Sequence, residues 1–590
     1  MILQALTEYY YTLEQAGKIA APGWSPVKVS FALQIGPDGA LEQVISVQTE
    51  QQRGKKTVWA PQVLSLPAPV KRTVGVAANF LCDNSSYMLG IDNKGKPQRT
   101  LECFDACKVL HEQILKDVDS PAAQAVLAFF RTWDPEQARE HPALVEHLDD
   151  ILSGGNLIFR AADDFAHNDP TVRAAWKAHY NAAGDGPQGI CLVTGEYGPV
   201  EAVHPAIKNV AGAQSSGAAL VSFNAPAFCS YGKEQNLNAP TGKHAAFAYT
   251  TALNHLLADR EHVYRVGDAT VVCWARGGGD LYQSFFGCAA FGQGEPAYEE
   301  SELRSMVKQL CRGEAVQYQQ ERLDPNMDFY VLGLSPNAAR LSVRFFLRNT
   351  FGNFLRNVQA HQDRLEIVRP AYDKFETLPL WKLLSETVNQ NARDKSPAPD
   401  LAGEVLRAIL NDTLYPATLL NGVTLRIRAE HEITRGRAAV IKAYYKKLTE
   451  VTEREHPDIP EEVLQVSLNE NSANIPYTLG RLFSVLEAIQ AAANPGINTT
   501  IKDKYFNSAA SIPAVIFPIL INLAQKHLKK LRGSNFGLAV FYEKQLTELY
   551  GHLGESYPAH MNLPQQGSFH LGYYHQTQAR YQKKEENEHV

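Results

Sequence analysis

The chain has few cysteines, and their spacing fits neither a disulfide framework nor a zinc site. Eight cysteines are scattered through 590 residues, none forms a Cys-x-x-Cys pair, and none follows Cys311. A disulfide-stabilised domain has a denser set, and a structural zinc site needs closely spaced ligands. We therefore expect reduced cysteines that serve packing, as in a cytosolic protein.

The sequence also lacks a long apolar run. The longest run spans residues 508–524 and is interrupted by Pro513 and Pro518. A membrane-spanning helix needs about 20 apolar residues, so a buried helix is predicted here instead. The N-terminal segment has no basic leader, and Glu8 and Glu14 interrupt any apolar core that a signal peptide would need. These features predict a cytoplasmic protein.

No excess of positive charge marks the chain as a whole. It has 57 Lys and Arg against 63 Asp and Glu, a formal net charge of -6. Proteins that bind nucleic acid over most of their surface are strongly basic, so that class is excluded. Any nucleic-acid site must be a local basic patch.

The common catalytic motifs are absent as well. The nearest match to a phosphate-binding loop, at Gly242, has Leu237 in place of the first glycine and His244 in place of Ser or Thr. Residues 212–217 have the wrong spacing for a nucleophile elbow, and the helix at His431 lacks the second histidine of a zincin. We therefore predict no catalytic residues, no metal and no cofactor, and a protein that binds and does not catalyse.

One alternative keeps catalysis open. His147, Asp149 and Asp150 lie on a predicted helix and are the donor types of a metal-dependent nuclease or hydrolase. The adjacent His-Asp pair of such enzymes is missing, and a solvated helix face has the same composition. Cys191 and His204 would join a metal site only if distant residues completed it.

Hydrophobic periodicity predicts an α+β fold, with a mixed α/β, multi-lobed N-terminal body and an all-α C-terminal helical bundle. Residues 2–17 form an amphipathic pattern, and two alternating runs flank Gly36-Pro37-Asp38-Gly39 as in a β-hairpin. The pattern divides the chain into an α/β region with basic and polar loops (1–105), a helical insertion (106–185), a second mixed α/β region (186–350), a helical connector (351–462) and the helical bundle (463–590).

The first candidate binding surface gathers basic and polar residues from the loops of the N-terminal region. Lysine and arginine contact phosphates, while Asn and Ser reach sugars and base edges. The candidates are Lys55, Lys56, Lys71, Arg72, Asn79, Asn84, Ser85, Ser86, Lys94 and Lys96. Solvated loops around a β-sheet have the same composition, so that interpretation stays open.

The second candidate surface is the segment 211–243, which is rich in small and amide residues. Its candidates for contacting duplex or RNA are Gln214, Ser215, Asn224 and Lys233, with Tyr231 and Asn238 nearby. The alternative is an ordered loop whose side chains bond to its own backbone.

The third candidate surface lies near the C-terminus. Lys526, Lys529 and Lys530 share a helix face by the i, i+3, i+4 rule, and Arg532, Lys502 and Lys504 are close in sequence. From residue 463 onward there are 11 basic and 9 acidic residues, a net of +2 against -6 for the whole chain. These residues are predicted to bind a nucleic-acid strand, although a solvated helix face would look the same.

Several long sequence blocks follow one another from residue 1 to about 350: ILQALTEYY, GKIAAPGWSPVKVSFAL, VAANFLCDNSSYMLGIDNKGK, GICLVTGE, IKNVAGAQSSGAALVSFNAPAFCSYGKEQNLNAP, HAAFAYTTALNHLLADR and LGLSPNAARLSVRFFLR. Together and in this order, they resemble the large subunit of type I-C CRISPR surveillance complexes (Cascade). The C-terminal helices fit the helical end of that family.

The resemblance implies a non-catalytic subunit that recognises the protospacer-adjacent motif (PAM) in duplex DNA, helps to open the strands and stabilise the R-loop, and helps to recruit a helicase-nuclease. It implies as partners CRISPR RNA, target double-stranded DNA, that helicase-nuclease, and the handle-capping, backbone and small subunits of Cascade. The bundle 463–590 resembles the small subunit, which the family can make from an internal start. A purely structural scaffold subunit is the remaining alternative.

Overall fold

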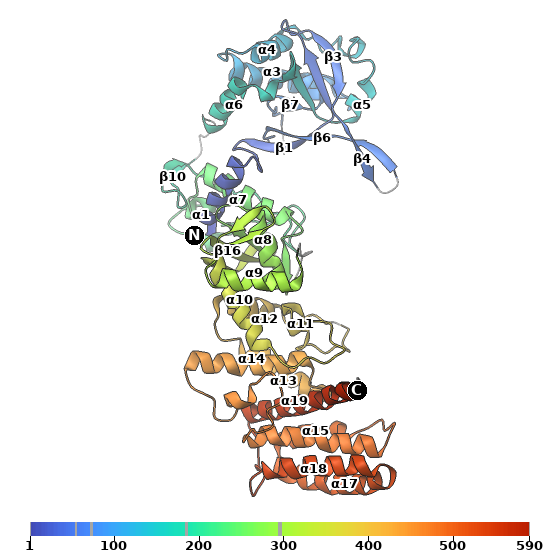
Figure 1. Cartoon of the computed structure of the whole chain (residues 1–590). Coiled ribbons are helices and arrows are strands. Elements are labelled where there is room, and N and C mark those ends of the chain that lie inside the picture. The colour runs from blue at the N-terminus through green and yellow to red at the C-terminus, as the bar shows by residue number, and fades with distance from the viewer. Residues whose placement is uncertain are drawn as a thin grey trace. The chain divides into compact units, whose positions relative to one another are not determined.

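The computed structural model describes residues 2–53, 56–70, 75–182, 187–292, 298–393 and 395–588. The chain forms two compact units: the first contains Met1–Pro205 and Val221–His255, and the second contains Ala206–Leu220 and Leu256–Val590 (Figure 1). Helices and strands both build the chain, which confirms the predicted α+β class.

A mixed sheet forms the centre of the first unit. Its strands are β2 (Phe31–Ile35), β3 (Leu41–Ser46), β7 (Cys82–Asp83), β8 (Leu157–Ala161) and β9 (Asp164–Phe165). The order is β3-β2-β8-β7, with β9 on β8, and β2 pairs with β8 in parallel. The predicted hairpin is confirmed: β2 and β3 are antiparallel. Gly39 in its turn has φ +85°, and a Cβ there would lie 2.2 Å from the Phe129 nitrogen, so only glycine fits.

Helices surround this sheet. They are α2 (Ser85–Met88), α3 (Pro97–Leu115), α4 (Pro121–Thr132), α5 (Leu148–Ser153) and α6 (Pro170–Ala182). Helix α4 packs on β2 and β8. Phe129 and Phe130 of α4 meet Phe159 of β8 with ring centroids 5.2 and 5.6 Å apart, an aromatic core for the unit.

The stretch 106–185, expected to be helical, contains the central strand β8. Four of its five residues are buried. A strand buried on both faces has a continuous apolar run, which periodicity alone does not distinguish from a buried helix.

Two antiparallel strand pairs lie outside the central sheet. Strand β1 (Trp24–Val29) pairs with β6 (Gln62–Pro67), and β4 (Thr49–Arg53) pairs with β5 (Lys56–Ala60). The rest of the unit contains α1 (Ile2–Gln15), the short pair β10 (Gln188–Ile190) and β11 (Tyr197–Pro199), and most of α7 (Lys243–Ala258). The predicted amphipathic helix is confirmed as α1: its apolar face is buried, and the Tyr10 ring meets Phe247 of α7 edge-on at 5.9 Å.

An antiparallel sheet opens the second unit. It has the order β12-β13-β16-β17 and consists of β12 (Tyr264–Val266), β13 (Ala269–Ala275), β16 (Asp328–Asn337) and β17 (Arg340–Thr350). These strands lie within the region 186–350, for which a mixed α/β pattern was predicted. Around the sheet lie α8 (Asp280–Phe286), α9 (Glu300–Cys311), the hairpin β14 (Val316–Tyr318) and β15 (Glu321–Leu323), and α10 (Phe351–Leu365).

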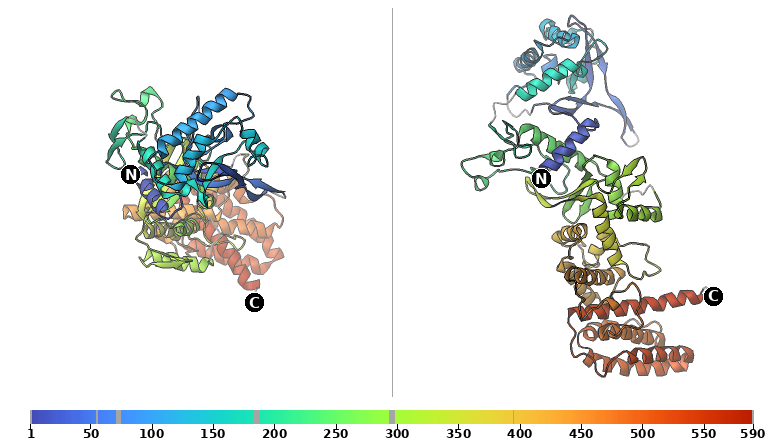
Figure 2. Two further views of the ribbon diagram at one scale, coloured as in Figure 1. Left: turned by 90° about the horizontal axis from the view of Figure 1, so that it is seen from above. Right: turned by 60° about the vertical axis from the view of Figure 1, so that its left-hand side comes forward.

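After α10 the described chain is helical, as predicted (Figure 2). The helices are α11 (Leu380–Ser385), α12 (Pro399–Asn411), α13 (Ala417–Glu430), α14 (Arg435–Thr452), α15 (Ile475–Ala493), α16 (Ile501–Ser511), α17 (Pro513–Ser534), α18 (Phe536–Gly551) and α19 (Leu563–Glu588). Helices α15 and α19 lie side by side and approach at two glycines. A Cβ on Gly480 would lie 2.0 Å from the Phe569 carbonyl oxygen, and one on Gly572 would lie 2.0 Å from that of Tyr477.

The apolar run 508–524 is not a single buried helix. It is divided at Ile512 between α16 and α17, and α17 is amphipathic: Phe517 and Leu520 are buried, whereas Val515 and Ile519 are 58% and 42% exposed. Within the described part of the chain, every helix is too short or too polar to cross a bilayer.

Candidate nucleic-acid interface

The first candidate surface is only partly described. Lys55, Lys71 and Arg72 lie outside the described residues. Lys56 is the first residue of β5, where its backbone pairs with Arg53 at the end of the β4–β5 ladder. The position of these residues in an interface therefore stays a prediction.

The polar residues of this surface serve the fold. The Asn84 side chain caps α2 by accepting a hydrogen bond from the Ser86 nitrogen at 3.0 Å. Ser85 and Ser86 are buried, and the Ser86 hydroxyl donates to Asp92 at 3.0 Å. The Asn79 side chain accepts from the Val70 nitrogen at 3.0 Å. Burial and these bonds argue against direct base contacts by the two serines.

Asp92 is the centre of this arrangement. Its carboxylate accepts hydrogen bonds from the Ser86 hydroxyl, the Thr100 hydroxyl at 3.0 Å and the Lys94 backbone nitrogen at 2.9 Å. Partial burial raises the pKa of Asp92, but these hydrogen bonds outweigh it, so the pKa lies below its usual value. The bonds fix the turn 92–96, on which Lys94 and Lys96 are exposed.

The second candidate surface is divided between the two units. In the second unit, residues 206–220 form an irregular hairpin with a bridge between Ile207 and Ala218, and Ala219 bridges Arg340 of β17. Gln214 and Ser215 are exposed at its turn. These two residues are therefore presented from an anchored loop.

In the first unit, residues 224–238 form an ordered loop. The Asn238 side chain accepts from the Ser230 nitrogen at 2.8 Å and donates to the Lys233 and Gln235 carbonyl oxygens at 3.1 and 2.9 Å. The loop has the side-chain bonds to its own backbone that the alternative describes. It also has exposed side chains, among them Asn224 and Lys233, so a contact surface stays a prediction. The bonds hold the loop while its outer side chains stay available.

The third candidate surface is the C-terminal half of α17. Lys526, Lys529, Lys530 and Arg532 are all exposed. Lys530 Nζ donates to the Asn494 side chain at 2.7 Å, and Arg532 pairs with Glu543 of α18. On α16, the ammonium groups of Lys502 and Lys504 lie over the rings of Tyr573 and Tyr505, at 5.2 and 5.1 Å. The α17 lysines thus form one basic helix face, and the α16 lysines already have aromatic partners.

Sequence reasoning missed the exposed aromatics of α18. Phe536 is 68% exposed and Phe541 is 46% exposed. The helix 536–551 has more apolar positions than one buried face holds, which was the available signal.

The metal-dependent alternative finds no support in the geometry. Among the described residues, no group of three or more His, Cys, Asp and Glu side chains is placed to hold a metal ion. The His147 ring packs on Phe31 at 5.2 Å, and Asp149 and Asp150 are exposed. The buried Cys191 sulfur accepts from the Val193 nitrogen at 3.4 Å, which makes it part of the β10–β11 turn.

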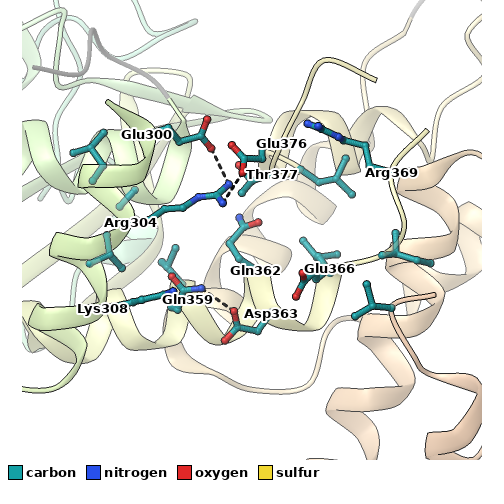
Figure 3. A pocket seen from close by; sticks show the side chains of 18 of the residues that line it. Glu300, Arg304, Lys308, Gln359, Gln362, Asp363, Glu366, Arg369, Glu376 and Thr377 are labelled. Carbon is teal, nitrogen blue, oxygen red and sulfur yellow. Dashed lines mark hydrogen bonds and ion pairs between the residues drawn. The ribbon is translucent and has the colours of Figure 1, made fainter. Parts of the chain in front are cut away.

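A cavity of about 810 Å³ lies in the second unit (Figure 3). It is lined by α9, α10 and the segment that follows α10, and its rim carries both charges. Arg304 pairs with Glu300 at 2.9 Å and with Glu376 at 2.7 Å, and the Gln359 amide donates to Asp363 at 2.7 Å. Four acidic and four basic side chains line the cavity, so it has no excess of positive charge that would attract a phosphate backbone.

A family model described as CRISPR-associated protein (Cas_Csd1) matches residues 6–581 of the chain. The chain therefore belongs to this family, and the resemblance to a Cascade large subunit is confirmed. It is a Cascade-type component of CRISPR defence whose partners are other CRISPR-associated components. No curated protein matches the chain.

Proposed function

We propose that the chain is the non-catalytic large subunit of a type I-C surveillance complex, acting in the cytoplasm. In this role it recognises the PAM in duplex DNA, assists strand opening, stabilises the R-loop and helps to recruit the helicase-nuclease. The observation that carries the proposal is the family match over residues 6–581. In RNA-guided systems, base pairing reads the target while protein reads a short flanking motif.

The two units supply different surfaces for this task. In the first unit, the turn at Lys94 and Lys96 and the loop 224–238 present exposed cations and amides from backbone that is fixed by internal hydrogen bonds. Preorganised polar loops of this kind suit contact with a duplex or with the CRISPR RNA handle, because little ordering is needed on binding.

In the second unit, the α17 lysines suit a strand backbone. Three exposed ammonium groups on one helix face contact phosphates without regard to sequence, and their effect falls with salt. These residues are proposed to hold the displaced or guide-paired strand.

Crosslinking of the assembled complex tests the proposal. The chain is co-expressed with its operon neighbours, bound to duplexes with and without a selected PAM, and crosslinked, and its peptides are mapped. We expect crosslinks at residues 94–96 and 231–233 that depend on the PAM, and crosslinks on α17 that do not. If no peptide of this chain crosslinks, the scaffold alternative is favoured.

The absence of catalysis needs its own test. The isolated chain, incubated with duplex and single-stranded DNA and with Mg²⁺, Mn²⁺ or Zn²⁺, is expected to leave the DNA uncut. Cleavage that disappears in the variant Asp149→Ala Asp150→Ala would instead favour a metal-dependent nuclease.

A further inference from the structure

Tyr231 occupies an unusual position on the loop 224–238. Its side chain is 99% exposed, and among the described large hydrophobic side chains none is more exposed. A ring that is fully hydrated in the free protein contributes nothing to packing, although burying it would be favourable.

The backbone at this point is strained. Tyr231 has φ 54° and Gln235 has φ 46°. Both values lie in the left-handed region of backbone conformation, which residues other than glycine rarely adopt. Such strain persists only where the surroundings hold it, and it concentrates at functional sites.

The surroundings do hold it. The Asn238 side chain fixes the chain at Ser230, Lys233 and Gln235 with three hydrogen bonds. Asn236 is buried, and its backbone nitrogen donates to the Ala202 carbonyl oxygen at 3.3 Å. The loop therefore presents the ring on a rigid support.

The neighbours of the ring indicate what it binds. Ser230, Gly232, Lys233, Glu234 and Gln235 are all exposed, so the tip at 230–235 is one aromatic ring among polar groups. Phe228, which precedes the tip, is less exposed, at 41%. The core of a protein–protein interface is a larger apolar cluster. Stacking on a nucleobase needs only one ring. The Lys233 ammonium and the Ser230 hydroxyl, close to Tyr231 in sequence, are groups that contact the sugar-phosphate backbone.

We infer that Tyr231 is a wedge that stacks on a nucleobase at the first base pair to open, with Lys233 on the adjacent phosphate. An aromatic or apolar side chain inserted at a base step replaces the lost stacking and so assists separation of the strands. This inference rests on the proposed function, which it deepens by naming the residue that opens the duplex.

The test compares R-loop formation on two targets. The complex carrying Tyr231→Ala is mixed with a fully paired target and with the same target containing a short mismatched bubble beside the PAM. We expect a rate about tenfold or more below wild type on the paired target, the size expected for the loss of one base–aromatic stack. On the bubble, the rate should equal that of wild type.

The controls separate stacking from other roles. Tyr231→Phe and Tyr231→Trp keep a ring and should open the paired target at wild-type rates. Tyr372→Ala removes another highly exposed tyrosine, 85% exposed, and should have no effect. Equal slowing on both targets, or loss of a protein subunit from the Tyr231→Ala complex, would overturn the inference. If the wild-type complex fails to bind the target, the proposed function itself fails.

Discussion

The Asp92 side chain anchors the turn that carries Lys94 and Lys96. It accepts hydrogen bonds from Ser86, Thr100 and the Lys94 nitrogen. Because hydrogen bonds to a charged group are worth about 1.5–3 kcal/mol and are only partly independent, Asp92→Ala should lower the free energy of unfolding of the first unit by roughly 2–3 kcal/mol. Urea denaturation at neutral pH measures this.

The sign of the pH dependence at Asp92 follows from its lowered pKa. A carboxylate with a depressed pKa in the folded state contributes stability above its unfolded pKa and loses it as the pH falls through the folded value. The difference between wild type and Asp92→Ala should therefore shrink below about pH 4. Asp149→Ala, at an exposed position, serves as the control, and an equal loss in that variant would contradict the assignment.

For single residues, the sequence showed which side chains are able to contact nucleic acid, but it did not show which of them the fold uses for its own hydrogen bonds. Asn84 and Ser86 have the groups that contact bases, but the same groups cap helices and bond to carboxylates. Asn84 takes the capping role on α2, and Ser86 takes the other because folding brings Asp92 next to it. The exposure of Lys94, Lys96 and Lys233 was easier to predict, because lysine side chains are seldom buried.

Among the elements, the pair α15 and α19 has the strictest packing requirement. Cβ atoms at Gly480 and Gly572 would lie 2.0 Å from backbone oxygen atoms of the facing helix. Backbone does not move aside as a flexible side chain does, so the helices must separate. We expect Gly480→Ala to destabilise the C-terminal helices by about 3 kcal/mol or more, as overpacking of a rigid site does.

Gly533 provides the matched control, because it lies near the end of α17 with no atom within 4 Å of an added Cβ. Gly533→Ala should be neutral or stabilising by up to about 1 kcal/mol, since alanine has the higher helix propensity. Circular dichroism during urea titration compares the variants, and equal behaviour of the two would contradict the close helix approach.

Element type was predictable where periodicity was strong, as in α1 and the β2–β3 hairpin. It was not predictable for β8, whose buried run pairs in parallel with β2, a partner more than a hundred residues away. The close approach of α15 and α19 could not be predicted from the sequence either. A glycine in a helix permits close packing, but it does not show which other helix packs there.

For the molecule as a whole, acid should be destabilising well before the carboxylates titrate. Burial lowers the pKa values of His111, His167 and His204 to about 4 and those of His361, His570 and His575 to about 3. Unfolded histidine titrates near 6.5, so below that pH the unfolded state binds more protons and stability falls, by up to about 1.4 kcal/mol per pH unit for each group.

Denaturant titrations from pH 7 to pH 4.5 test this expectation for both units, since His111, His167 and His204 belong to the first unit and the other three to the second. His560 is exposed, and His560→Gln should leave the slope unchanged. Stability that is flat across this range would show that these buried histidine rings do not control acid sensitivity.

The net charge of -6 makes the α17 lysines a sensitive test of strand binding, because the chain as a whole repels DNA. Replacing Lys526, Lys529 and Lys530 by alanine should reduce the affinity of the complex similarly for all single-stranded sequences. Each lost phosphate contact lowers the slope of log K against log salt by about 0.7, so three contacts lower it by about 2.

Lys116, an exposed lysine of the first unit, supplies the control variant Lys116→Ala. Filter binding at several salt concentrations gives both quantities. An affinity loss with an unchanged salt slope would mean that the lysines act through structure, such as the Lys530 bond to Asn494, and not through phosphates.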